Sequence, residues 1–275
     1  MTREEILVNE DGETRVLWHD TAADLADAAD RGPVRECDPG WTGETWKAAL
    51  DGARRGRTAL VADAERLLEQ VQSEVLVSRS EWVRSRAGAF PVVPEALQGF
   101  PEPMRRKVWS PSDRSPLRVF VDLVSSAGVE RAHLMRRGVA CLALAMALGQ
   151  ERALELWAVI PARTGQRIVS VVQIPTTPFD LAGACYALTS VGFVRGLGYS
   201  LAKSVGGRHR HERWAFGYYP DSDAQRARYV RQLRAVLGAS EVDLVVPPTF
   251  LGDPAAADSV GFVRRTLAEH SGGET

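Results

Sequence analysis

The chain has 275 residues, of which 45% are hydrophobic and 25% are charged, and its formal net charge is −1. This composition is ordinary for a soluble globular protein, and it excludes a uniformly basic nucleic-acid coat and an acidic disordered tail. Three widely spaced cysteines match neither a disulfide framework nor a CxxC metal site, which favours a reducing cytoplasm. Because no stretch has the roughly 18 uninterrupted apolar residues of a membrane span, and the first residues lack the apolar segment of a signal peptide, we expect neither membrane insertion nor export.

The N-terminal part of the chain is acidic and is predicted to be mostly helical. Residues 1–50 contain twelve Asp or Glu and five Lys or Arg. Apolar spacing and capping residues predict helices over residues 21–32, from Thr42 or Glu44 onward, and over residues 59–76. Frequent prolines predict an irregular connector over residues 88–116. Residues 1–110 are therefore interpreted as a mostly helical region with its connector.

Buried strands alternate with helices over residues 115–270. The predicted strands are 117–124, 153–161, 167–175, 214–219 and 241–248. The predicted helices are 128–149, about 179–204, 224–238 and about 255–270. This alternation is typical of α/β proteins, and it predicts a mostly parallel, Rossmann-like sheet of five strands between helices.

Oxygen-bearing side chains follow three of these predicted strands. The first strand delivers Asp122, Ser125 and Ser126, the third delivers Thr176, Thr177 and Asp180, and the fourth delivers Asp221, Ser222 and Asp223. Ligands of an open parallel sheet bind at the carboxyl ends of its strands, and carboxylate and hydroxyl oxygens are the ligands that Mg²⁺ prefers. The sequence therefore predicts that oxygens from these three loops could hold a divalent cation such as Mg²⁺.

This set of oxygens resembles the metal site of the von Willebrand factor A fold, in which the motif D-x-S-x-S follows the first strand. Here Val124 stands at the middle serine position, and Ser125 is one place out of register. The resemblance implies a von Willebrand factor A-like domain over residues 115–270, in which Asp122, Ser126, Thr176 and Asp221 converge on a weakly bound magnesium ion. The alternative is that no cofactor binds, and that Asp122 and the serines cap the helix that begins near Gly128.

Two further segments carry a second resemblance. The runs WTGETWKAALDGARRG (41–56) and GAFPVVPEALQGFPEPM (88–104) combine Trp, Gly and Pro in an unusual arrangement. They resemble a family of uncharacterised proteins of bacteriophages and mobile elements. The resemblance implies a phage or prophage origin, and it implies no particular activity.

A basic region lies between residues 203 and 237. Its Lys and Arg residues are Lys203, Arg208, Arg210, Arg213, Arg226, Arg228, Arg231 and Arg234. Arg228, Arg231 and Arg234 recur every three residues, so they are predicted to share an exposed helix face. Such a region is typical of a footprint for nucleic-acid phosphates, and the alternative is a solvated helix face that balances the acidic N-terminal part.

The remaining motifs favour packing over catalysis. The glycines of GFVRGLG (192–198) lie inside a predicted helix and are expected to allow close helix packing, while Cys141 and Cys185 are expected in the core. No nucleotide-binding, HExxH or GxSxG motif is present. The sequence therefore predicts a binding or assembly protein without enzymatic activity, whose strand-end loops contact a protein partner. Nucleic-acid binding in phage replication, recombination or packaging is the alternative function.

Overall fold

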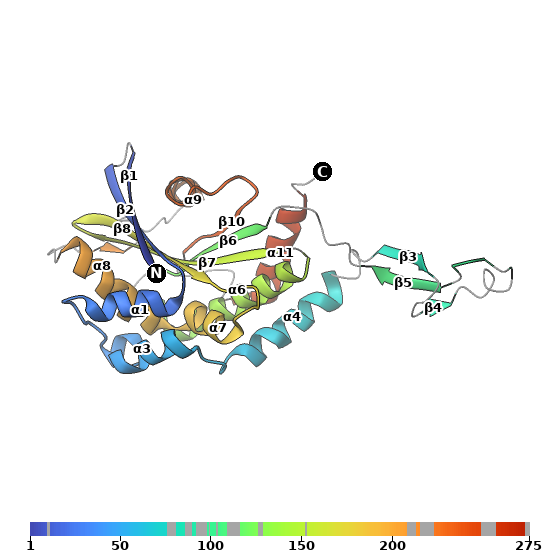
Figure 1. Cartoon of the computed structure of the whole chain (residues 1–275), viewed down its shortest axis with the longest axis horizontal. Helices are drawn as coiled ribbons and strands as arrows, with labels where there is room; N and C mark the ends of the chain where they lie inside the picture. Colours follow the sequence, from blue (N-terminus) through green and yellow to red (C-terminus); the bar gives the residue numbers. More distant parts are fainter. Residues whose placement is uncertain are drawn as a thin grey trace.

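The computed structural model of the chain describes residues 1–9, 12–75, 81–85, 90–91, 98, 100–102, 104–108, 116–125, 129–151, 153–207, 213–214, 223–248 and 257–272. The strands of its main sheet are β1 (Thr2–Asn9), β2 (Gly12–His19), β6 (Leu117–Asp122), β7 (Leu154–Thr164), β8 (Gln166–Ile174), β9 (Arg213–Trp214) and β10 (Leu244–Val246). Six of them follow the order β1-β2-β8-β7-β6-β10, and β9 pairs with β7 off this path (Figure 1).

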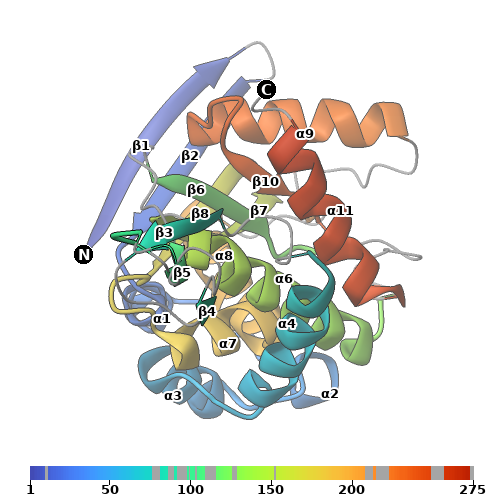
Figure 2. The same cartoon turned by 90° about the vertical axis from the view of Figure 1, so that its right-hand side faces the viewer.

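Helices cover both faces of this sheet. They are α1 (Ala22–Arg31), α2 (Pro39–Thr42), α3 (Trp46–Arg55), α4 (Val61–Val75), α6 (Arg131–Glu151), α7 (Leu181–Thr189), the π-helix η2 (Gly192–Gly198), α8 (Tyr199–Gly206), α9 (Asp223–Leu237) and α11 (Ser259–Gly272). Figures 1 and 2 show α1, α6, α7 and α8 on one face of the sheet and α9 on the other. The α/β class predicted from the sequence is therefore confirmed.

The strand directions are mixed, so the prediction of a mostly parallel sheet is wrong. The pairs β2/β8, β6/β7 and β6/β10 are parallel, whereas β1/β2, β7/β8 and β7/β9 are antiparallel. The cause of the β7/β8 reversal is local. Thr164 pairs with Gln166 across Gly165, whose φ is +82°, and a connection this short cannot carry the chain back for a parallel crossover.

Residues 2–9 and 12–19 also differ from the expected helical region. They form the antiparallel pair β1/β2, and β2 pairs in parallel with β8. Val16 and Leu17 of β2 consequently belong to the hydrophobic core of the main sheet. Helices begin only at Ala22, where the Thr21 side chain accepts a hydrogen bond from the Asp24 amide and caps α1. The N-terminal part is thus tied into the main sheet through β2.

The helix expected at about 179–204 is broken into three parts. Asp180 caps α7 through the Gly183 amide, and α7 ends at Thr189. The following helical segment, Gly192–Gly206, is inclined to α7 by 78° and begins with the π-helix. After this sharp bend, Arg195 of η2 reaches the Ser125 hydroxyl beyond the end of β6.

Residues within the expected irregular connector form part of a second, small sheet. Its strands are β3 (Glu81–Ser85), β4 (Phe90–Pro91) and β5 (Met104–Val108), paired antiparallel in the order β3-β5-β4. Figure 1 shows these strands beyond α4. The strands add nothing to the main sheet, whose outer strands are β1 and β10.

By length and composition α6 could cross a membrane, and it is the one unbroken helix of the described residues with this property. More than half of its apolar window is buried inside the protein, and Cys141 in its centre is 1% exposed. A core helix of a soluble protein has these same features, and the apolar residues of α6 belong to the hydrophobic core. Cys185 on α7 is also buried, which confirms the expectation that both cysteines pack in the core.

Candidate functional site

The parallel strands β6, β7 and β10 bring their carboxyl ends to one edge of the sheet. Leu123, Val124 and Ser125 follow β6 at this edge, and Pro247 follows β10. Helices α6 and η2 pack beside them and contribute Arg137 and Arg195. The edge therefore meets the geometric rule for ligand sites in open sheets, and we call it the strand-end edge.

Asp122 is the last residue of β6, and its carboxylate is fully buried. Its Oδ1 accepts a hydrogen bond from the Val124 amide at 2.9 Å, and its Oδ2 accepts one from the Tyr229 hydroxyl of α9 at 2.5 Å. Burial raises the pKa of Asp122 to about 7, against the opposing effects of these two donors and of Arg137. Asp122 thus links β6 to α9 through Tyr229. The helix that was expected to begin near Gly128 is α6, which begins at Arg131.

Thr176 lies at the opposite edge of the sheet from Asp122. Its hydroxyl donates to the Leu154 carbonyl, and Leu154 pairs with Leu117 at the start of β6. The length of β6 therefore separates Thr176 from Asp122 by about 16 Å, at a rise of about 3.3 Å per residue. The reason is the antiparallel direction of β8, which the prediction took to be parallel.

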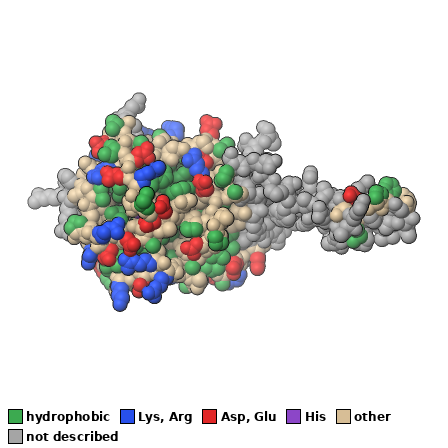
Figure 3. All heavy atoms as spheres, viewed as in Figure 1, with side chains coloured by type: hydrophobic (Ala, Val, Ile, Leu, Met, Phe, Trp, Pro, Cys, Tyr) green, Lys and Arg blue, Asp and Glu red, His purple; other side chains and the backbone are tan. Residues whose placement is uncertain are grey.

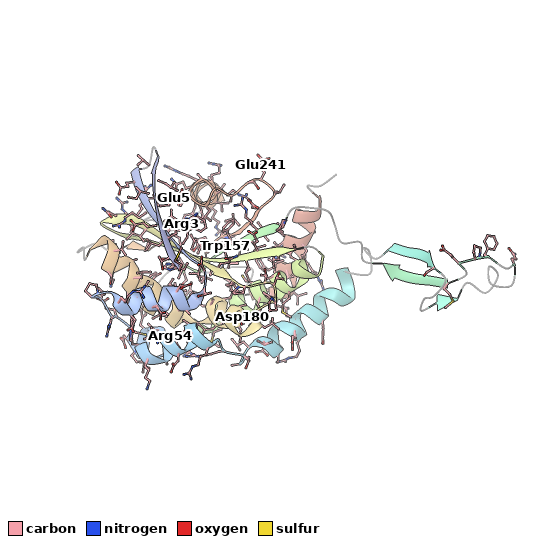
Figure 4. The ribbon with its side chains drawn as sticks, in the orientation of Figure 1. Arg3, Glu5, Arg54, Trp157, Asp180 and Glu241 are labelled. Atoms are coloured by element: carbon pink, nitrogen blue, oxygen red, sulfur yellow. The ribbon has the colours of Figure 1, made fainter. Side chains whose placement is uncertain are left out.

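The predicted magnesium site does not fit this arrangement. Asp122 and Thr176 do not converge, and both oxygens of Asp122 hold protein donors. Ser126 and Asp221 lie outside the described residues. Within the described ranges, no group of three or more His, Cys, Asp or Glu side chains could hold a metal ion. Asp180, which also follows β8, caps α7 (Figure 4).

Two arginines are buried at the strand-end edge. Arg137 is 3% exposed, and its Nη2 donates to the carbonyl oxygens of Asp122, at 3.0 Å, and Pro247. Arg195 is 7% exposed, and its Nη2 donates to the Ser125 hydroxyl at 3.2 Å. The Arg195 guanidinium also lies 5.0 Å from the centre of the Trp41 ring, a cation–π distance.

A small cavity opens between these arginines and the start of η2. Its polar lining consists of Ser125, Arg137, Thr189, Ser190 and Arg195, and the remaining lining is aliphatic. Its volume is about 20 Å³, which accommodates a water-sized or slightly larger group. The cavity combines two permanent cations with three hydroxyl groups.

The π-helix is held in place by the segment 41–46. Glu44 of this segment accepts hydrogen bonds from the Tyr186 hydroxyl at 3.1 Å, from Arg57 at 2.5 Å and from the Ser190 hydroxyl. A side chain at Gly192 would collide with Glu44. The glycines of η2 therefore permit close packing, as predicted, and a π-helix of this kind is frequent at functional sites.

The described basic residues divide into two groups. Lys203 forms an ion pair with Glu36. Arg234 donates to the carbonyl oxygens of Ser240 at 2.5 Å and Asp243 at 2.9 Å, so it holds the turn that leads into β10. By contrast, the exposed arginines of α9 are Arg226, Arg228 and Arg231. The predicted exposed face is therefore wrong for Arg234.

Three predicted basic residues remain without a described side chain. Arg208 and Arg210 lie outside the described residues, and of Arg213 only the backbone in β9 is described.

Arg137 and Arg195 are not among the site residues predicted from the sequence. Arg195 is the one charged residue of GFVRGLG (192–198), and Arg137 is the second of two adjacent arginines that precede the apolar run GVACLALAMALG (138–149). A permanent charge that the chain carries into its core is the signal that points to such a site.

A family model described as "Domain of unknown function (DUF7192)" matches residues 15–271. No curated protein and no solved structure matches the chain. The expectation of an uncharacterised family is thus confirmed, whereas the von Willebrand factor A assignment and the phage origin stay predictions. The match spans almost the whole sheet and its helices, and the chain belongs to this family of domains of unknown function.

Proposed function

We propose that the protein is a binding protein that holds a phosphate or carboxylate group of its ligand in the strand-end cavity. The observation that carries this proposal is that two guanidinium groups, each less than a tenth exposed, line the same small cavity. Arginine stays protonated at every physiological pH, so both groups bring a permanent positive charge into the protein. An anion bound between them would receive charge-assisted hydrogen bonds.

The electrostatics around the cavity support an anionic ligand. Arg137 donates to the carbonyl oxygens of Asp122 and Pro247, and Arg195 donates to the Ser125 hydroxyl. Arg137 lowers the pKa of the neighbouring Asp122 carboxyl, but burial raises it more strongly. The resulting pKa is about 7, so Asp122 is only partly ionised at neutral pH. The Ser125 hydroxyl, which accepts a hydrogen bond from Arg195, adds a neutral polar group, whereas the hydroxyls of Thr189 and Ser190 donate to the Cys185 carbonyl and to Glu44.

The size of the cavity narrows the predicted binding function. A cavity of about 20 Å³ has room for a group of about the size of one water molecule, so one terminal oxygen of the ligand's phosphate or carboxylate would enter it. The assembly role expected from the sequence therefore becomes recognition of one such group, whether it is carried by a small molecule or by a protein partner. The phage or mobile-element origin implied by segments 41–56 and 88–104 stays a prediction and carries no part of this proposal.

Calorimetric titration with inorganic phosphate and with acetate tests the proposal. We expect saturable binding of at least one of them, and Arg195→Gln and Arg137→Gln are expected to weaken it at least tenfold, the loss of one charge-assisted pair. Arg231→Gln removes an exposed arginine and is the matched control, with unchanged affinity. Ser125→Ala is the milder variant if a buried arginine variant does not fold, and a threefold or greater loss is expected. Absence of binding by both anions, or an equal loss in Arg231→Gln, contradicts the proposal.

Nucleic-acid binding is the second candidate function, and the exposure of Arg226, Arg228 and Arg231 on α9 favours it. The acidic residues of the N-terminal part do not require these arginines for balance. Glu4 pairs with Arg15 at 2.6 Å and Asp27 pairs with Arg54 at 2.8 Å, and Figure 3 shows basic and acidic side chains intermixed on the face in view. The arginines of α9 are thus a candidate footprint for phosphates.

Fluorescence anisotropy with single- and double-stranded oligonucleotides tests this candidate. Three phosphate contacts predict that log affinity falls with log salt at a slope of roughly −2 to −3. Replacing Arg226, Arg228 and Arg231 together with Glu is expected to abolish binding, and Arg163→Glu, at an exposed position of β7, is expected to have little effect. A slope near zero, or unchanged binding in the triple variant, contradicts the candidate.

A further inference from the structure

A second, larger groove lies on the other side of α6, between α4, α6 and the start of α11. Its volume is about 430 Å³, and α6 contributes Ala132, Met135, Arg136 and Val139 to its lining. These residues follow the spacing i, i+3, i+4, i+7, so they form one face of the helix. The groove is therefore continuous along about two turns of α6.

The floor of this groove is apolar. Leu60 and Leu67 come from the α4 side and face Met135 and Val139 across the groove. Leu67 is 8% exposed, and Leu60 and Val139 pack against the hydrophobic core. Aliphatic side chains of this kind favour a ligand whose own apolar surface is removed from water when it binds.

The rim of the groove carries one cation that is open to a ligand. Arg66 already pairs with Asp63 on α4, at i, i+3. Arg136 is exposed, and within the described part of the chain it has no hydrogen bond or ion pair. An anionic group that enters the groove would therefore meet Arg136, with the apolar floor beside it.

We propose that this groove binds an aliphatic carboxylate, with its hydrocarbon chain along Leu67, Met135 and Val139 and its carboxylate on Arg136. Ala132 to Val139 spans about 10 Å of helix at 1.5 Å per residue, which suits a chain of medium length. The volume falls in the range of small-molecule sites, roughly 300–1,000 Å³. The single cation at the rim matches a single negative charge. This site is separate from the strand-end cavity, and its failure or success is independent of the function proposed above.

Calorimetric titration with hexanoate, octanoate and decanoate, each below its micellar concentration, tests this inference. Each added methylene group is expected to tighten binding up to about fourfold, from roughly 0.8 kcal/mol of burial. Octylammonium carries the same chain with the opposite charge and is expected to bind at least tenfold more weakly than octanoate. Arg136→Gln is expected to remove this preference, and Met135→Trp, which fills the groove, is expected to abolish binding of both.

Arg231→Gln is the matched control, because it removes an exposed arginine from α9 and leaves the groove unchanged. If Met135→Trp fails to fold, Arg136→Gln carries the test alone, since Arg136 is exposed and its replacement disturbs no described contact. Affinity that does not rise with chain length overturns the inference. Octanoate binding that Arg136→Gln and Met135→Trp leave unchanged overturns it as well.

Discussion

Gly138→Ala is expected to destabilise the protein by about 1–3 kcal/mol, the usual cost of overpacking a tight contact. Gly138 lies in α6, and a Cβ atom at this position would stand 2.3 Å from the carbonyl oxygen of Leu188 and 2.8 Å from its carbonyl carbon. These are backbone atoms of α7, which cannot rotate away as a side chain can. Because Leu188 and Thr189 also line the strand-end cavity, a shift of α7 is expected to weaken phosphate binding too.

The same substitution elsewhere in α6 provides the control. A Cβ atom at Gly149 would meet only Leu154 Cδ2, at 3.8 Å, which is an ordinary contact. Gly149→Ala is therefore expected to stabilise the protein by up to about 1 kcal/mol, because alanine has the higher helix propensity. Urea denaturation measures the free energy of unfolding of both variants. Equal effects of the two substitutions would show that α6 and α7 do not approach as closely as described.

Asp122→Asn and His19→Gln are expected to change the pH dependence of stability in opposite directions. Burial raises the pKa of Asp122 from 3.8 to about 7 and lowers the pKa of His19 from 6.5 to about 4. His19 is 1% exposed, and its Nδ1 lies 3.1 Å from the Thr2 hydroxyl. Each group therefore binds protons differently in the folded and unfolded states, and this difference makes the free energy of unfolding depend on pH.

Between pH 4 and pH 7 the two contributions oppose each other. The folded state holds the proton of Asp122 more tightly, so the contribution of Asp122 is present at low pH and is lost as the pH rises toward 7. The unfolded state holds the proton of His19 more tightly, so the contribution of His19 is lost as the pH falls from 6.5 toward 4. Each is worth about 3 kcal/mol over this range.

Denaturation of the wild type and both variants at pH 4, 5, 6 and 7 measures these slopes. Relative to the wild type, Asp122→Asn is expected to lose about 3 kcal/mol on going from pH 7 to pH 4, and His19→Gln is expected to gain a similar amount. Asparagine keeps an oxygen for the Val124 amide, and its NH2 group can donate to the Tyr229 hydroxyl, so the contact between β6 and α9 is largely preserved. Parallel pH profiles for all three proteins would contradict the assignment of both groups.

Local patterns in the sequence determined most of the helices and several strands of the main sheet. The apolar spacing of residues 59–76 and 224–238 predicts α4 and α9 to within two residues, because a helix depends on contacts three and four residues apart. The buried runs at 117–124 and 167–175 likewise match β6 and β8. These two helices and two strands could therefore be predicted from the sequence before any tertiary contact was known.

Tertiary structure alone decided strand direction and the candidate site. The antiparallel pairing of β7 and β8 places Thr176 at the edge away from Asp122, and no local pattern distinguishes this from a parallel order. Arg137 and Arg195 are 58 positions apart, and they line one cavity because the bend at Ser190 turns η2 toward the end of β6. Periodicity specifies which face of an element is buried. Which side chains then meet depends on long-range pairing, whose energy is spread over the whole sheet.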